Sequence, residues 1–137
     1  MKLAVSLCAL LLSTAAVAAG PKTHLMDFST ATLMDEDTAK RLMDENIPDK
    51  VWKLYPAKRY TFLSQVEGGM HEDVCVVTAR VMLLPLSPTI KKVLFEPFKT
   101  STTFDSAPGS TVESCKALAA KLLKDATTSV VSSLVNP

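Results

Sequence analysis

The chain has 137 residues, with 15 Lys and Arg against 14 Asp and Glu, so its formal net charge is +1. This near-neutral balance excludes the strong positive charge that favours nucleic acid or an anionic membrane surface as a partner. The length supports one hydrophobic core but not two domains of ordinary size.

The first nineteen residues, MKLAVSLCALLLSTAAVAA, combine one positive charge, a short apolar run and a series of small residues. This pattern is typical of a secretory signal peptide, so we expect residues 1–19 to be removed on export to a periplasm or the extracellular space. The apolar run is shorter than the ~20 residues of a membrane-spanning helix, and we expect no span after cleavage. The sequence lacks an Asn-X-Ser/Thr acceptor, which is compatible with a bacterial envelope.

Residues 20–31 lack sustained periodicity and are expected to form an N-terminal lead, whereas residues 32–137 are expected to form a single domain. Acidic residues from Asp35 onward precede apolar residues at helical spacing, which predicts a short helix. Pro48 should end this helix and begin a second short helical turn.

A β-hairpin is predicted around Gly68 and Gly69, because β-branched and aromatic residues flank this dipeptide on both sides. If the two glycines form a two-residue turn, Phe62 lies opposite Cys75. Strand alternation then places one apolar row on the core face of the hairpin. The row consists of Tyr60, Phe62, Cys75, Val77, Ala79, Val81 and Leu83.

The segment 91–104, KKVLFEPFKTSTTF, is predicted to form a third strand. Pro97 lies inside it and cannot donate to a ladder, so an edge strand or a bulge is expected. Ser110 and Glu113 have the spacing of a capping box and predict the start of a C-terminal helix with a regular apolar stripe. The β-branched residues beyond Thr127 lower helix propensity and leave the end of this helix open.

Cys75 and Cys115 are the two cysteines that remain after removal of the signal peptide. The period of two places Cys75 on the core face of its strand, and the period of 3.6 places Cys115 on the apolar stripe of its helix. An even number of cysteines in an exported chain favours a disulfide over a reactive thiol. We therefore predict a Cys75–Cys115 disulfide.

His71, Glu72 and Asp73 form a polar cluster between the glycines and Cys75. In a strand, His71 and Asp73 point to one face and Glu72 to the other, so the three side chains do not converge on one metal ion. The only other histidine, His24, lies in the N-terminal lead. We therefore expect a solvated turn here, with no catalytic residue, no cofactor and no metal site.

These patterns predict an α+β domain of order α-β-β-β-α, with an antiparallel sheet of at least three strands, a covering C-terminal helix and one disulfide. An exported, neutral domain of this kind favours a protein-binding module, such as an inhibitor, an immunity-type protein or an envelope accessory protein, over an enzyme. Loops on a rigid scaffold often carry binding. The expected contact surface is the hairpin tip, formed by Gly68, Gly69, Met70, His71, Glu72 and Asp73.

Two alternatives stay open at this point. One is a small hydrolase or metal-dependent enzyme that uses His71 with Glu72 or Asp73. The other is a carrier that binds a small apolar ligand in a pocket between the helix and the sheet. The partner of the favoured binding module is another protein whose identity the sequence does not indicate.

Overall fold

The computed structural model describes residues 20–87 and 96–136 of the chain, so the expected signal peptide lies outside the described residues. The strands form one sheet of order β1-β2-β3-β4, in which β1 is parallel to β2 and the other neighbours are antiparallel. The predicted α+β class, with a covering C-terminal helix, is confirmed. In chain order the elements are β1 (Leu25–Asp27), α1 (Glu36–Asn46), α2 (Asp49–Leu54), β2 (Tyr60–His71), β3 (Val74–Pro85), β4 (Lys99–Ala107) and α3 (Val112–Val135).

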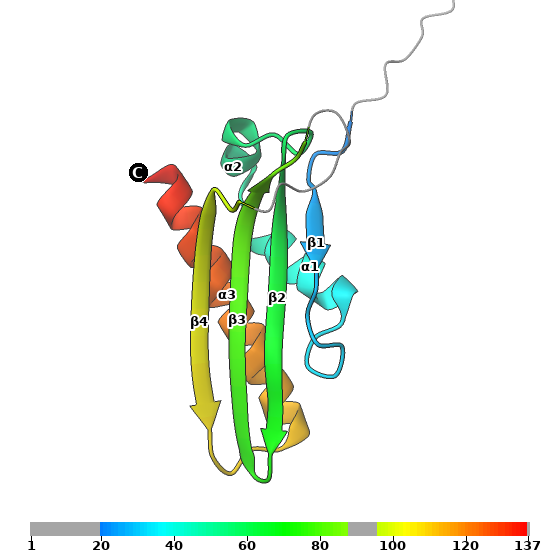
Figure 1. Cartoon of the computed structure of the whole chain (residues 1–137), viewed down its shortest axis with the longest axis vertical. Coiled ribbons are helices and arrows are strands. Elements are labelled where there is room, and N and C mark those ends of the chain that lie inside the picture. The colour runs from blue at the N-terminus through cyan, green and yellow to red at the C-terminus, as the bar shows by residue number, and fades with distance from the viewer. Residues whose placement is uncertain (1–19, 88–95, 137) are drawn as a thin grey trace, which may run out of the picture.

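The helices α1 and α3 lie on one face of the sheet, and α3 crosses it from the β2–β3 turn toward the opposite end (Figure 1). Between these layers β2 contributes Phe62 and Val66, and β3 contributes Val77 and Leu83, all fully buried. They join one hydrophobic cluster with the apolar side chains of α1 and α3, such as Leu123. Burial of this cluster stabilises the two-layer arrangement.

The observed β2–β3 register places Phe62 opposite Leu83, not opposite Cys75 as predicted. The predicted core face is nevertheless confirmed, because Phe62, Cys75, Val77, Ala79, Val81 and Leu83 are all fully buried. Moving the turn by an even number of residues changes the partners but keeps each side chain on its face.

The helix α1 begins after Asp35, whose side chain accepts a hydrogen bond from the Thr38 N–H at 2.8 Å. This bond holds the pKa of the Asp35 carboxyl below its ordinary value of 3.8, because it stabilises the charged form. As predicted, the helix ends before Pro48, and Pro48 directly precedes α2.

The strand β1 has no counterpart among the predicted elements. Its three residues pair in parallel with β2, with Leu25 opposite Phe62. The pairing continues beyond the strand, because the Phe28 N–H donates to the Ser64 carbonyl at 2.9 Å. A strand of this length is too short to show a period of two, so only its contact with β2 reveals it.

The strand β4 begins at Lys99, so Pro97 lies before the strand and not inside it. The predicted strand began at residue 91, and residues 91–95 lie outside the described part of the chain. As expected, β4 is an edge strand, paired with β3 in the sheet. The missing N–H of Pro97 therefore costs no ladder hydrogen bond.

The helix α3 continues through Thr127 and ends at Val135. Its last turns bury Val130 and Leu134, and Thr127 donates its hydroxyl hydrogen to the Leu123 carbonyl at 2.8 Å. Burial of this apolar face outweighs the low helix propensity of the β-branched residues.

Candidate functional site

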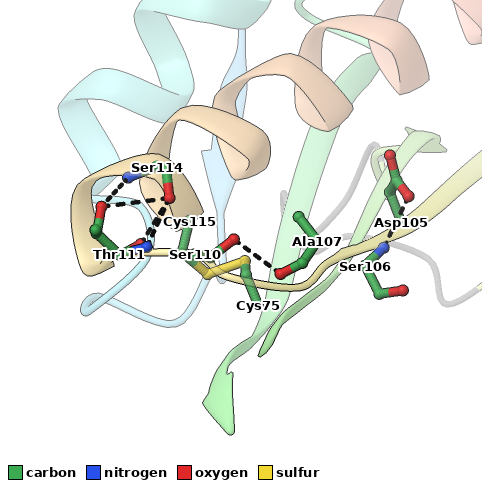
Figure 2. The surroundings of a disulfide bond; sticks show 8 residues. All are labelled: Cys75, Asp105, Ser106, Ala107, Ser110, Thr111, Ser114 and Cys115. Atoms are coloured by element: carbon green, nitrogen blue, oxygen red, sulfur yellow. Dashed lines mark hydrogen bonds between the residues drawn. A yellow bond between two sulfur atoms is a disulfide. The ribbon is translucent and has the colours of Figure 1, made fainter. Parts of the chain in front are cut away.

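The predicted disulfide is present between Cys75 of β3 and Cys115 of α3, with Cα atoms 5.4 Å apart. Both cysteines are buried, which fits the core face and the apolar stripe inferred from their periodicities. Figure 2 shows the bond at the first turn of α3. It ties the helix to the sheet close to the β2–β3 turn.

A hydrogen bond joins the two loops at this end of the molecule. The Ser110 N–H, in the β4–α3 loop, donates to the Asp73 carbonyl oxygen in the β2–β3 turn at 2.8 Å. The Ser110 hydroxyl donates to the Ala107 carbonyl at 2.8 Å, and Ala107 pairs with Cys75 (Figure 2). We call residues 71–74 and 107–111 the braced loop pair.

The start of α3 differs from the prediction by one residue. Thr111, not Ser110, is the N-cap, and its partner in the capping box is Ser114, not Glu113. The Thr111 side chain accepts from the Ser114 N–H at 3.2 Å, and the Ser114 hydroxyl accepts from the Thr111 N–H at 2.8 Å. Ser110 instead lies in the loop, where its N–H bonds Asp73 of the other loop and its hydroxyl bonds Ala107 of the same loop.

The hairpin turn lies at Glu72 and Asp73, and the predicted turn at Gly68 and Gly69 is wrong. His71 and Val74 are the last paired residues, and Glu72 has a φ of 56°. This left-handed conformation is usual for glycine and uncommon for glutamate. The later turn lengthens both strands to 12 residues and so adds ladder pairs that an earlier turn would lose.

The two glycines instead lie within β2, opposite Val77 and Val76. Both have positive φ, 126° at Gly68 and 154° at Gly69. A Cβ atom on Gly68 would lie 2.0 Å from the Val76 carbonyl oxygen, whereas one on Gly69 would meet no atom within 4 Å. A glycine is therefore required at position 68 because the Val76 backbone approaches closely, and not because the chain turns there.

The predicted contact residues thus separate into two groups. His71, Glu72 and Asp73 are exposed in the braced loop pair, and Met70 is half-buried against the core. Gly68 and Gly69 lie farther back along the strand. Pro108 and Gly109 are also exposed in the loop pair and were missed by sequence analysis, although a Cys75–Cys115 bond implies that the segments flanking both cysteines meet.

The enzyme and carrier alternatives gain no support from the described geometry. Among residues 20–87 and 96–136, no three His, Cys, Asp or Glu side chains gather closely enough to hold a metal ion. A shallow depression lined by Gln65, Glu67, Thr78 and Arg80 lies on β2 and β3. The layer between α3 and the sheet is occupied by the hydrophobic cluster.

No protein-family model matches this chain, and no curated protein matches it. Among solved structures, the chain is similar to the PelC dodecamer from Paraburkholderia phytofirmans, with 15% identity and a TM-score of 0.42 over 80% of this chain and 86% of that chain. A candidate lipoprotein from Caulobacter crescentus is similar at 11% identity and a TM-score of 0.34, over 80% of this chain and 82% of that chain. These values are too low to carry an argument about function.

Across the part of the chain that the structure describes, none of the helices has both the length and the apolar character needed to cross a bilayer.

Proposed function

We propose that this chain is a small exported protein-binding module whose contact surface is the braced loop pair. The observation that carries the proposal is the Ser110–Asp73 hydrogen bond between two exposed loops, next to the disulfide that ties α3 to β3. Loops that are rigid before binding lose little conformational entropy on association, so their contacts translate more fully into affinity.

The charge of this end suggests the kind of protein surface that it contacts. Glu72, Asp73, Asp105 and Glu113 are exposed on or next to the loop pair, and Lys116 is the nearby cation on α3. Complementary charge raises association rates and suppresses wrong partners. We therefore propose a partner with a basic contact surface.

The proposed export rests on one sequence feature and on the disulfide. The leader pattern of residues 1–19 directs secretion, and a disulfide persists in an oxidising compartment. The proposal assigns binding to this protein and no catalytic step to His71.

Site-specific photocrosslinking in cells tests this function. A photoreactive amino acid at position 72 lies on the loop pair, and the same amino acid at Lys124, exposed on α3, is the matched control. We expect a discrete adduct to another protein from position 72 and none from position 124, identified by mass spectrometry.

A second step tests the charge argument. With the crosslinker at Pro108, the charge reversals Glu72→Lys and Asp73→Lys should abolish the adduct, whereas Lys124→Glu should leave it unchanged. Equal adducts from the loop pair and from α3, or no adduct from the loop pair, would contradict the proposed function.

A further inference from the structure

The end of the molecule opposite the braced loop pair carries a group of aromatic side chains. It is formed by α2, the start of β2 and the start of β4 (Figure 1). The Tyr55 ring lies 5.3 Å from that of Tyr60 and 5.6 Å from that of Phe98, measured between centroids. The Arg59 guanidinium lies 5.9 Å from the Tyr60 centroid. Three chain segments thus meet in one aromatic cluster.

Part of this cluster is open to solvent. Phe98 is 53% exposed, and Leu54, next to Tyr55 at the end of α2, is 60% exposed. Both are large apolar side chains that ordinarily gain free energy by leaving water. These exposed apolar side chains are therefore accessible for contact with another molecular surface.

Exposed cations lie on the same chain segments as these apolar side chains. Lys50 and Lys53 share an exposed face of α2 with Leu54, since residues three and four apart are neighbours on a helix. The three ion pairs found among the described residues lie within α1 and α3 and include none of these cations. We call the whole set the aromatic–basic end: Leu54, Tyr55, Tyr60 and Phe98 with Lys50, Lys53, Lys58, Arg59 and Lys99.

The charges of the chain are therefore separated along its long axis. In the described segments 48–60 and 96–99, which form the aromatic–basic end, five cations stand against two carboxylates, Asp49 and Glu96. Acidic side chains dominate at the loop pair. The near-zero net charge of the whole chain hides this polarity.

We propose that the aromatic–basic end docks on the surface of an anionic lipid membrane. Lysine and arginine are attracted to the negative surface potential of such a bilayer, and exposed aromatic and aliphatic side chains enter its interfacial region. Aromatic rings are enriched at that depth, and lysine stems can lie along apolar surface while the ammonium groups remain in water. Mixed apolar and cationic composition on one small surface fits this partner better than either feature alone.

The length of β2 sets the distance between the two ends of the molecule. Its 12 residues run from Tyr60, in the aromatic–basic end, to His71, in the loop pair. At ~3.3 Å per residue this strand spans roughly 36 Å from its first to its last Cα atom, so docking would hold the loop pair far from the bilayer. Membrane docking does not rest on the proposed protein-binding function. Vesicle binding can be absent while crosslinking at the loop pair still succeeds.

The test is flotation of the purified exported protein with vesicles of phosphatidylglycerol in phosphatidylcholine, compared with vesicles of phosphatidylcholine alone. We expect binding to the anionic vesicles that weakens as salt is added, since exposed charges are screened. Each cation near an anionic surface strengthens binding about fivefold, so Lys53→Gln with Lys58→Gln should lower the partition coefficient about 25-fold. Lys116→Gln with Lys124→Gln changes the net charge equally on α3 and should leave binding unchanged.

The apolar contribution has its own matched control. Leu54→Ser or Phe98→Ser should each weaken vesicle binding roughly fivefold, as expected when about half of such a side chain no longer leaves water. Phe104, which is 66% exposed on β4 opposite Thr78, lies outside the aromatic–basic end, so Phe104→Ser should bind like wild type. Circular dichroism checks that each variant is folded.

Three results would overturn the proposal. The first is no flotation of wild-type protein with anionic vesicles, and the second is equal flotation with neutral ones. The third is a control variant that loses as much binding as its matched variant. This applies to the α3 lysine variant compared with Lys53→Gln plus Lys58→Gln, and to Phe104→Ser compared with Phe98→Ser.

Discussion

Gly68 and Gly69 offer a comparison in which the same substitution is made at adjacent positions of β2. Both have positive φ, but only Gly68 lies against a backbone atom of the neighbouring strand. We predict that Gly68→Ala destabilises the protein much more than Gly69→Ala. A turn at the two glycines would instead make both substitutions similarly harmful, because both central residues of a type I′ turn need positive φ.

The magnitudes follow from the two environments. At Gly69 the added Cβ meets nothing within 4 Å, so the cost is backbone strain alone, about 1 kcal/mol of the free energy of unfolding. At Gly68 the same kind of strain applies, and the Cβ would also lie 2.0 Å from the Val76 carbonyl oxygen. The strands must separate there, which weakens one or two ladder hydrogen bonds worth about 0.5–1.5 kcal/mol each. We therefore expect about 2–4 kcal/mol for Gly68→Ala.

Guanidinium unfolding followed by circular dichroism measures this difference. The wild type and both variants should show the same denaturant slope, so that a lower midpoint reports lower stability. Equal midpoints for the two variants, or a lower midpoint for Gly69→Ala, would refute the observed strand register and the close approach of Val76.

Three further predictions concern the disulfide, the turn and the first helix cap. Replacing Cys75 and Cys115 with alanine removes a cross-link with a sequence separation of 40 residues and should lower the free energy of unfolding by about 4 kcal/mol. In the wild type, non-reducing mass mapping should find no free thiol at either position. His71→Ala should change the free energy of unfolding by no more than about 0.5 kcal/mol, because the side chain is exposed, and calorimetry should detect no stoichiometric zinc binding. Asp35→Ala should lower the melting temperature at neutral pH. The pKa of Asp35 is depressed in the folded state, so its contribution to stability is complete above pH 3.8 and is lost as the pH falls through the folded-state pKa. The melting temperatures of wild type and variant should therefore converge in acid.

Periodicity was enough to identify the buried faces of the main elements. Alternation along β3 placed Cys75 inward, and the helical stripe of α3 placed Cys115 inward, so their bond could be predicted from the sequence. This inference survived an error in the register, because a strand has a period of two and the turn moved by four residues, from 68–69 to 72–73. The chemical nature of each face is thus encoded locally.

Local signals failed where a distant contact decided the outcome. The Gly68-Gly69 pair resembles a turn signal, but both residues lie inside β2, and Gly68 meets the close approach of Val76 from the neighbouring strand. Ser110 with Glu113 has the spacing of a capping box, but Ser110 binds Asp73 and leaves the cap to Thr111. In both places a contact with another segment of the chain decides the local structure, and local spacing does not record that contact.

The sequence by itself determined the α+β class, the apolar faces and the cysteine pairing, because periodicity and composition act along one element at a time. Only the tertiary structure decided the position of the hairpin turn, the bracing of two loops and the separation of charge between the ends. A sequence reports the sum of its charges, which is close to zero here. Their positions depend on how β2, α2 and α3 pack, and a binding surface depends on positions, since electrostatic attraction weakens with distance.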